Sequence, residues 1–529
     1  MPGAARPAVN EFVTLLKPGT ARLSGILPQV SRSLLAIDQG TTGTTALVMG
    51  EDGSTRSRAN VEFPQHFPEP GQVEHEPEEI WQSVIDSVAE ALRQAGVSGA
   101  ELSAIGISNQ RETTLLWERE TDRPVHRALV WQDRRTADRC NELRARGEET
   151  HVRTLTGLVL DPYFSATKLA WLLENVDGAR ARAERGELAF GTVDSFLVWR
   201  LCGGAKARAP HVTDVTNASR TMLMHLADRR WDEGLCKLFG IPSAVLPQIV
   251  PSAGIVGHTL GMPGLSDGIP IAGLAGDQHA ALFGQACFAS GEAKCTYGTG
   301  AFLLVNTGSS PVTSRFGLLS TVGWQIGKDV TYALEGSCFV AGALVQWLRD
   351  GLNVIQSAPE IEALARSVSS TDGVVVVPAL AGLGAPYWDA GARGLISGIT
   401  RGTTRAHLAR AVLEAIAFEV GDVLQAMAED LGRPIKKMRA DGGAAANDLL
   451  LQLQADLAGI SVDRPNELES TARGAAMLAG VGSGLYRDGR EAAKMVKLNA
   501  TFDVRMDGVE RASRVRAWQD AVRRARSNL

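Results

Sequence analysis

Two stretches of the chain share one pattern, in which two short apolar runs flank a turn made of glycine and threonine. The first is LLAIDQGTTGTTALVMG, residues 34–50, and the second is AKCTYGTGAFLLVNTG, residues 293–308. Short apolar runs around a glycine-rich turn predict a β-hairpin. Because the pattern recurs about half a chain later, we predict two halves of similar design.

Elsewhere, buried-type strands alternate with amphipathic helices, which indicates an α/β fold. The run GIPIAGLAG leads into Asp277 and a helix of small residues, and KMRADGG leads into a helix that Asn447 would cap. The Pro- and Gly-rich segment 246–270 is predicted to be a surface loop. Further helices are predicted over residues 76–95, 167–175, 342–352 and 406–431.

A chain of 529 residues is too long for one hydrophobic core, so we expect two domains, over residues 34–285 and 286–500. Residues 1–33 lack a continuous apolar run and are rich in Ala, Arg, Pro and Gly. They predict a disordered extension, or translation from an upstream start codon, and no secretory signal. Residues 501–529 predict a tail with a basic, solvated helix.

Composition narrows the class of protein. The hydrophobic fraction of 44% and the charged fraction of 21% are typical of a globular enzyme. A formal net charge of -5 argues against a nucleic-acid partner. No apolar run is long enough for a membrane span. The six scattered cysteines form no Cys-x-x-Cys pair, which predicts buried thiols, no zinc site and a cytoplasmic protein.

The two predicted hairpin turns are the first candidates for chemistry. The sequence has no Walker A motif and no Gly-x-Gly-x-x-Gly that opens a helix, so a P-loop kinase and a Rossmann dehydrogenase are poor interpretations. A Gly/Thr turn directs backbone N–H groups and hydroxyls into one concavity, which suits an anion. Asp38 would repel phosphate unless Mg²⁺ lay between them. Two facing turns would hold a polyphosphate; the alternative is two ordinary hairpins.

Three further features could act on a substrate. Asp277 could take the proton of an attacking hydroxyl, or it could be a plain helix N-cap. Arg111 and Glu112 follow a strand and could bind neighbouring hydroxyls, or they could form a surface ion pair. Aromatic residues near these loops could pack on a small carbon backbone or simply fill the core; they are Trp131, Tyr163 and Phe302.

At this point the sequence resembles a known family, the FGGY carbohydrate kinases of the actin-like ATPase superfamily. The resemblance is collinear over residues 34–485 and is most specific for members that phosphorylate glycerol. It rests on the motifs IDQGTTGTT, SNQRETT, VWQDRRT, LVLDPYFSATKLAWLLEN, TDVTNASRTML, AGDQHAALFGQ, CTYGTGAFLLVNTG, ALEGSCFVAGALVQWLRD, PALAGLGAPYWD and DGGAAANDLLLQLQADL.

The resemblance implies two actin-like (ribonuclease H-like) ATPase domains with a cleft between them. It implies transfer of a phosphoryl group from ATP with Mg²⁺ to glycerol, which gives sn-glycerol 3-phosphate, in a homodimer or homotetramer. Asp277 would be the catalytic base. The glycerol ligands would be Arg111, Glu112, Tyr163, Asp277 and Gln278, between apolar walls formed by Trp131 and Phe302.

The resemblance also implies a nucleotide site. The phosphate contacts would be Thr41, Thr42, Gly43 and Thr299, and the adenine side would be Gly342, Gln346, Gly443 and Asn447. Asp38 and Asp277 would lie at the Mg²⁺ ion.

Two departures from the family pattern alter these expectations. Gly43-Thr44-Thr45 stands where the family commonly has Ser-Ser-Arg, which removes a cation near the phosphates and predicts a raised KM for ATP. The stretch GHTLGMPGLSDGIP has Gly268 at the position of an arginine that binds fructose 1,6-bisphosphate in some members. This stretch has no Lys or Arg and carries Asp267, so we do not expect that regulation.

Two other functions remain open at this level. The substrate could be another polyol or a ketopentose, although Arg111 and Glu112 with Tyr163 favour a small triol. Alternatively, the chain could be a nucleotide-dependent sensor that has lost catalysis through the change at Thr45.

Overall fold

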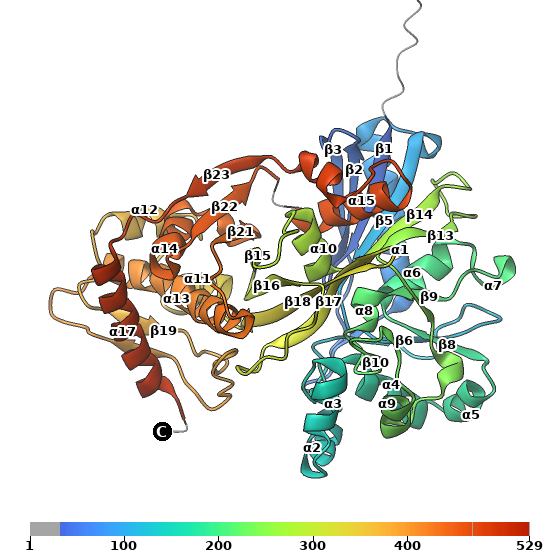
Figure 1. The fold of residues 1–529 in the computed structure, drawn as a ribbon, viewed down its shortest axis with the longest axis horizontal. Coiled ribbons are helices and arrows are strands. Elements are labelled where there is room, and N and C mark those ends of the chain that lie inside the picture. Colours follow the sequence, from blue (N-terminus) through green and yellow to red (C-terminus); the bar gives the residue numbers. More distant parts are fainter. Residues whose placement is uncertain (1–31, 468, 528–529) are drawn as a thin grey trace, which may run out of the picture. The chain divides into compact units, whose positions relative to one another are not determined.

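The computed structural model describes residues 32–467 and 469–527. The predicted N-terminal extension falls almost wholly outside the described residues, since strand β1 begins at Ser33. Residues from Arg32 onward form one compact unit. One large sheet runs through this unit, with helices on both faces (Figure 1).

The first predicted hairpin is the centre of the first half of the sheet. Strands β1 (Ser33–Gln39) and β2 (Gly43–Gly50) are antiparallel, and β3 (Thr55–Glu62) extends the hairpin. On the other side of β1, β5 (Leu102–Asn109) and then β14 (Pro270–Gly276) run parallel to it. The order β3-β2-β1-β5-β14 therefore joins an antiparallel hairpin to parallel strands.

The second hairpin repeats this arrangement. Strands β15 (Ala293–Tyr297) and β16 (Ala301–Gly308) are antiparallel, and β18 (Asp329–Cys338) pairs with β16. Beyond β15, β21 (Lys437–Asp441) and β22 (Ser461–Pro465) are parallel to it. The order β18-β16-β15-β21-β22 matches the first half strand for strand, which confirms the predicted fold class.

The two halves join into one sheet of 13 strands through the pairing of β13 with β17. The remaining strands of this sheet are β13 (Ala253–His258), β17 (Leu319–Ile326) and, at the far edge, β23 (Leu498–Phe502). Strand β13 and the short β12 (Gln248–Val250) lie in the segment predicted to be a surface loop. That prediction is wrong because the Pro and Gly residues separate these strands without preventing them.

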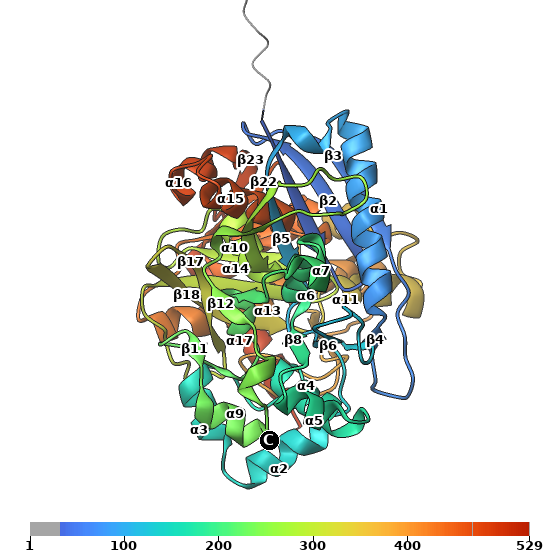
Figure 2. The same cartoon turned by 90° about the vertical axis from the view of Figure 1, so that its right-hand side faces the viewer.

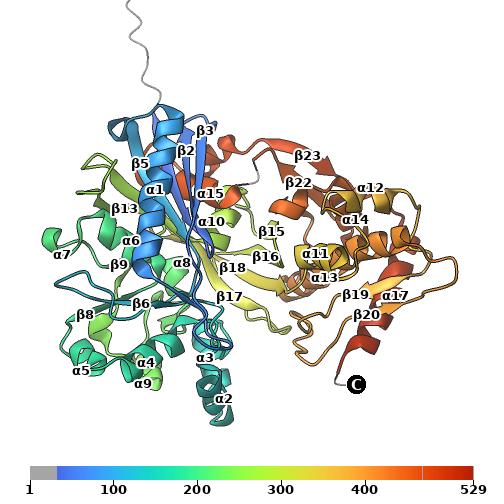
Figure 3. The same ribbon diagram turned by 180° about the vertical axis from the view of Figure 1, so that it is seen from behind.

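Strand β1 is buried on both faces, which explains why its sequence is continuously apolar. Leu35 and Ile37 pack with helix α1 (Pro77–Ala95), whereas Leu34 and Ala36 pack with helix α15 (Ser470–Gly482) on the opposite face. Figure 3 shows α1 lying along the strands of this half. Helix α15 comes late in the sequence, so the end of the chain completes the core of the first half.

The other predicted helices are present with small shifts of their ends. Helix α11 (Gly342–Gln346) continues as a π-helix over Trp347–Gly351, and Asn447 caps α14 through a bond from the Leu450 N–H at 2.9 Å. A group of helices joins the strands of the first half below the sheet (Figure 2). Further helices of the two halves are α2 (Ala137–Ala145), α3 (Glu149–Thr156), α4 (Ser165–Asn175), α5 (Ala179–Glu184), α6 (Val193–Leu201), α8 (Val215–Ala218), α9 (Glu233–Phe239), α12 (Glu360–Arg366), α13 (Arg405–Leu431) and α14 (Asp448–Ala458).

The C-terminal helix α17 (Gly508–Ala525) is present, but the prediction that it is merely solvated is wrong. Trp518 is fully buried and stacks on the ring of Phe418 at 5.2 Å between ring centroids. Its indole N–H donates to Asp422 at 2.6 Å. One apolar stripe of this basic helix therefore packs on α13, while the charged residues remain outside.

Helices α10 (Asp277–Gly284) and α15 cross closely where the two halves meet (Figure 1). A Cβ atom added at Gly474 would lie 1.8 Å from the carbonyl oxygen of Ala280. Since Asp277 is the first residue of α10, this crossing determines where the predicted catalytic carboxylate lies.

We predict that Gly474→Ala lowers the free energy of unfolding by about 1–3 kcal/mol, because the added methyl group forces the two helices apart. The measurement is urea unfolding monitored by circular dichroism. Gly421→Ala is the matched control: Gly421 lies in α13 with open space around its Cα, so alanine there should be neutral or stabilising by up to about 1 kcal/mol. Equal stabilities of the two variants would contradict the prediction.

Candidate active site

The first Gly/Thr turn is held at the end of β1 by backbone bonds. The N–H of Gly40 donates to the Gly43 carbonyl at 2.9 Å, and the N–H of Gln110, just after β5, donates to the Gln39 carbonyl at 2.7 Å. The hydroxyl of Thr41 accepts from the Trp131 indole at 2.9 Å, and Thr42 is exposed. The turn thus faces the ends of parallel strands, where open α/β sheets bind ligands.

The second turn packs against the backbone at the start of α11. The N–H of Gly342 donates to the Gly298 carbonyl at 3.0 Å, and the N–H of Ala343 donates to the Thr299 carbonyl at 3.0 Å. A Cβ atom at Gly342 would lie 2.6 Å from the Gly298 oxygen, so only glycine fits this approach. The exposed side chain of Thr299 remains available to a ligand.

The residues predicted to contact the adenine lie at the same end of the sheet as the second turn. Gly442, with φ 84°, packs on Tyr297 directly beside the second turn, and exposed Gly443 follows it. Asn447 uses its side-chain oxygen to cap α14, which leaves its amide nitrogen as the group that can reach a ligand. Gln346 is exposed one turn into α11.

Asp277 lies at the start of α10, but it is not the N-cap, because Gly276 occupies that position. Its Oδ1 accepts from the Gln278 N–H at 2.7 Å and forms an ion pair with Arg111 Nε at 3.0 Å. The side chain is 32% exposed, so one side of the carboxylate faces solvent. Gln278 is held from behind, since its side-chain oxygen accepts from the buried Lys294 ammonium.

Arg111 and Glu112 are buried, with side chains 3% and 1% exposed, so the surface ion-pair interpretation is wrong. Glu112 has φ 60°, a left-handed conformation that is uncommon for a residue other than glycine and that occurs often at functional sites. Its backbone carbonyl accepts from the Ser165 hydroxyl at 3.0 Å, which helps to hold this conformation.

Two charged residues that the sequence did not single out complete this group. Arg220 Nε donates to Glu112 at 2.7 Å, and Arg220 Nη2 donates to Glu335 at 3.0 Å. Glu335 also accepts from Arg111. The sequence did contain a signal for Glu335, because this residue is the charged one in the stretch ALEGSC of strand β18. We define Arg111, Glu112, Arg220 and Glu335 as the arginine–glutamate cluster.

The predicted aromatic residues border this cluster. Tyr163 accepts from Arg111 Nη2 at 3.4 Å and meets the ring of Trp131 edge-on at 5.6 Å between centroids. Phe302 on β16 lies directly opposite Ser337 of β18, two residues from Glu335, so Phe302 and Glu335 share a face of the sheet. The structure therefore links Thr41, Trp131, Tyr163, Arg111, Asp277 and Gln278 through successive contacts.

Asp38 offers a carboxylate to a cation beside the first turn. Burial raises the pKa of Asp38 from its ordinary value of 3.8 to about 7, against a bond from the Ser108 hydroxyl, and the charge of Asp277 raises it further. Among the described residues, no group of three or more His, Cys, Asp or Glu is arranged so that it could hold a metal ion by itself. A cation here would take most of its ligands from water and phosphate, as Mg²⁺ does.

Thr45 lies directly opposite Asp38 in the β1–β2 pairing. It is 7% exposed, and its hydroxyl accepts from the Asn60 amide on β3 at 2.9 Å. An arginine at this position would therefore extend beside the Asp38 carboxylate. The resemblance implies that such an arginine contacts the phosphates of the nucleotide there.

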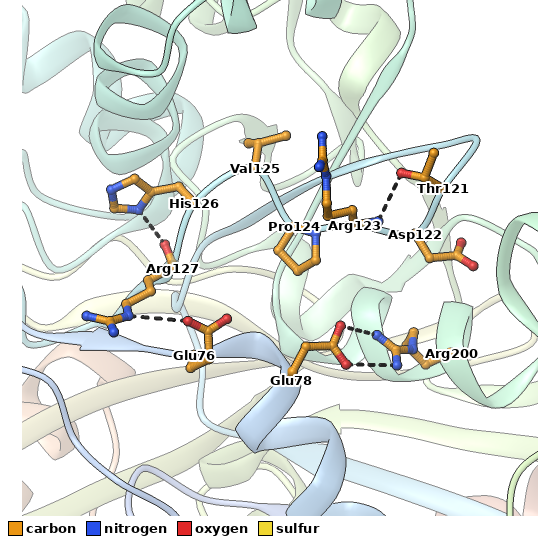
Figure 4. A pocket seen from close by; sticks show the side chains of 10 residues that line it. All are labelled: Glu76, Glu78, Thr121, Asp122, Arg123, Pro124, Val125, His126, Arg127 and Arg200. Carbon is orange, nitrogen blue, oxygen red and sulfur yellow. Dashed lines mark hydrogen bonds and ion pairs between the residues drawn. The ribbon is translucent and has the colours of Figure 1, made fainter.

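A separate cavity of about 590 Å³ lies away from these turns, between α1, α6 and the segment 121–127 (Figure 4). Its three arginines are already paired. Arg200 binds Glu78 at 2.6 and 3.0 Å, Arg127 binds Glu76 at 3.3 Å, and Arg123 binds Glu118 at 3.0 Å. Because these charges neutralise each other, the cavity gives no indication of an anionic ligand.

Two halves with the same strand order, each with a Gly/Thr turn at its first hairpin, define a two-domain actin-like kinase fold. Residues 33–284 match the N-terminal domain and residues 293–483 match the C-terminal domain of the FGGY family of carbohydrate kinases. The chain belongs to this family.

Proteins named as glycerol kinases are similar to this chain over nearly its whole length. The sequence is 54% identical over 497 residues to glycerol kinase of Myxococcus xanthus, covering 94% of this chain and 99% of that protein. It is 56% identical over 493 residues to glycerol kinase of Aromatoleum aromaticum, covering 93% and 98%. The crystal structure of Plasmodium falciparum glycerol kinase with ADP superposes with a TM-score of 0.88 at 34% identity, covering 94% and 99%. Within the described residues, every helix is too short or too polar to cross a membrane.

We predict that Asp38→Asn stabilises the ligand-free protein at pH 8. The pKa of Asp38 is raised in the folded state, so its ionisation costs stability as the pH rises from about 4 through 7. Solvent screening of this partly exposed group limits the gain to the order of 1–3 kcal/mol. Urea unfolding in EDTA at pH 8 and pH 4.5 measures it, and the gain should shrink at the lower pH. A gain in stability that is equal at both pH values would contradict the raised pKa of Asp38.

Proposed function

We propose that this protein transfers the γ-phosphoryl group of ATP to a terminal hydroxyl of glycerol, producing sn-glycerol 3-phosphate and ADP. The observation that carries the proposal is the Arg111–Asp277 ion pair at the start of α10, beside Tyr163 and Trp131. The substrate is supported by 54–56% identity to glycerol kinases along more than nine-tenths of the chain.

In this proposal, the polyol lies among charged and aromatic side chains. Arg111 donates and Glu112 accepts, so neighbouring hydroxyls of a triol would each find a complementary group. Trp131 and Phe302 would contact the carbon backbone from its two sides. The full set of proposed glycerol ligands is Arg111, Glu112, Tyr163, Asp277 and Gln278.

The nucleotide would lie between the two turns. Thr41, Thr42 and Gly43 on one side and Thr299 on the other would bind the phosphates, because both turns offer N–H groups and hydroxyls at the ends of strands. Gly342, Gln346, Gly443 and Asn447 would border the adenosine. Asp38 and Asp277 would hold Mg²⁺, which supplies charge neutralisation on the transferring phosphoryl group.

Asp277 would act as the general base. Its carboxylate takes the proton of the terminal hydroxyl as that oxygen forms a bond to the γ-phosphorus, and the bond from the γ-phosphorus to the bridging oxygen of ADP breaks. Arg111 holds the carboxylate through Oδ1, so Oδ2 is the atom placed to receive the proton. Exclusion of water from the cleft would prevent hydrolysis of ATP.

Several wider expectations accompany this proposal. The domain division at 34–285 and 286–500 is supported by the matches over 33–284 and 293–483. A cytoplasmic homodimer or homotetramer with no nucleic-acid partner remains our expectation. We also expect no regulation by fructose 1,6-bisphosphate, since Asp267 accepts from the Gly261 N–H at 2.7 Å and places an anion in the loop that would bind it.

We predict that Asp277→Asn lowers kcat for glycerol phosphorylation by about 10²- to 10⁴-fold, because the amide cannot accept the hydroxyl proton. The KM for glycerol should change less, since the amide can still bond Gln278 and the substrate. Coupled ADP release with glycerol, xylitol and a ketopentose as substrates measures this. Asp267→Asn, at an exposed acid, is the control and should keep wild-type rates. A near wild-type kcat for Asp277→Asn would refute the role of Asp277.

We further predict that Thr45→Arg lowers the KM for ATP by up to about 10-fold, as expected for one added bond between a guanidinium and a phosphate. Thr45→Val, which removes only the hydroxyl that Asn60 binds, controls for loss of that bond. Steady-state kinetics at saturating glycerol decide the matter. An unchanged KM in Thr45→Arg would mean that this departure from the family pattern is silent.

A further inference from the structure

The arginine–glutamate cluster contains four charges almost wholly removed from water. The exposed fractions of its side chains are 3% for Arg111, 1% for Glu112, 0% for Arg220 and 3% for Glu335. Burial of a charge is costly unless a partner of opposite sign and good geometry is present. Each of these four buried charges therefore requires a partner of opposite sign within the cluster.

Glu335 is the centre of the cluster. Its Oε2 accepts from Arg111 Nη1, and its Oε1 accepts from Arg111 Nη2 at 3.2 Å and from Arg220 Nη2 at 3.0 Å. Arg111 is thus bound by two parallel bonds, which orient a planar guanidinium more strictly than a single bond does. Burial alone would raise the pKa of Glu335, but the two arginines hold it well below its usual range, so this carboxylate stays ionised.

The geometry of the guanidinium connects Glu335 to the proposed catalytic carboxylate. Arg111 presents its two Nη atoms to Glu335 and its Nε atom to Asp277 at 3.0 Å. Because the guanidinium group is rigid and planar, the edge held by Glu335 determines the direction of the edge that faces Asp277. Arg220 cannot take over this role, since it carries the same charge and repels Arg111.

Glu335 also belongs to a different half of the molecule from the arginines. Arg111 follows β5, and Arg220 follows α8, both in the first half. Glu335 is on β18 in the second half, between Leu304 on β16 and Leu319 on β17. It lies on the same face of the sheet as Phe302, the other proposed contribution of the second half to the polyol site.

We propose that Glu335 is a positioning residue for polyol binding. From the second half, it orients Arg111 and neutralises Arg220, so that the hydroxyl-binding side chains of the first half take their binding geometry only when the two halves are joined. This inference rests on the proposed glycerol kinase activity, but nothing in that proposal assigns a role to Glu335.

The first experiment compares Glu335→Gln with the wild type in steady-state kinetics. Glutamine keeps the size of the side chain but loses the charge that holds Arg111. We expect the KM for glycerol to rise about 10- to 100-fold, the effect of losing charge-assisted bonds. The KM for ATP should change less than about 3-fold, because the bonds described for Glu335 go to Arg111 and Arg220 and not to the turns at Thr41 and Thr299. A kcat that falls with both KM values unchanged would overturn the proposal.

A second readout separates positioning from general loss of structure. The ratio of kcat/KM between variant and wild type is measured for glycerol, propane-1,2-diol and propane-1,3-diol. If Glu335 acts through Arg111, the penalty should shrink at least about 5-fold for the diol that lacks the hydroxyl bound by Arg111. A penalty of equal size for all three substrates would indicate a merely structural role and would overturn the proposal.

Glu414→Gln is the matched control. Glu414 is also a buried carboxylate in the second half, and its Oε1 lies between two arginines, Arg410 at 3.2 Å and Arg514 at 3.0 Å. It lies on α13, away from the turns and the cluster. We expect this variant to unfold at a lower temperature while its KM for glycerol stays within about 2-fold of the wild type. An equally large rise in this KM would contradict the special role of Glu335.

The remaining outcomes are also informative. Wild-type protein that does not phosphorylate glycerol would refute the proposed function, whereas active wild type with an unaffected Glu335→Gln would refute only the inference. Should Glu335→Gln not fold, Glu335→Asp replaces it in the same three-substrate comparison. Aspartate keeps the charge but shortens the reach, so a rise in the KM for glycerol smaller than 10-fold is expected, and no rise would overturn the proposal.

Discussion

Charges buried at the junction of the two halves impose the strongest constraint on this molecule. Arg111 and Arg220 are removed from water by the first half, and the carboxylate that both require comes from the second. Removing one partner of such a group leaves an uncompensated buried charge, which costs about 3–5 kcal/mol. The junction is therefore held together by electrostatics in the arginine–glutamate cluster and by the close crossing of α10 and α15 at Gly474.

These two contacts converge on Asp277. Helix α10 begins at this residue, so the packing of α10 on α15 sets its position along the sheet, while Arg111 sets the direction of its carboxylate. A base must lie within bonding distance of the proton that it removes, and small displacements are costly in rate. The two turns proposed to bind the nucleotide are held in a similar way, because each receives backbone bonds from a neighbouring element.

The sequence predicted the architecture well because both of its signals are local. A glycine-rich turn between apolar runs and a helix capped by Asn447 depend on near neighbours, and both are found where expected. The predictions failed where distant packing decides. Strand β13 needed β14 and β17 to form, and Trp518 needed the surface of α13. Glu335 was missed for the same reason, since its partners are 224 and 115 residues away in the sequence.

The departure from the family pattern at Thr45 lies opposite a carboxylate that several nearby charges influence. Asp38 faces Thr45 across the hairpin. Burial is the main cause of the raised pKa of Asp38; the charges of Asp277 and Glu469 raise this pKa further, while the Ser108 hydroxyl and Arg58 lower it. Arg58 is itself bound to Glu469 at 3.0 Å, so its charge is shared. Where the family commonly has an arginine, this chain has a hydroxyl that bonds Asn60. The first turn therefore carries an excess of negative charge on the side where a triphosphate would bind. Under the proposed function, this excess makes phosphate binding at the first turn depend more strongly on a divalent cation than it would with an arginine at position 45. The reason is that Coulomb repulsion between Asp38 and the phosphates is offset by the charge of Arg58, which is shared with Glu469.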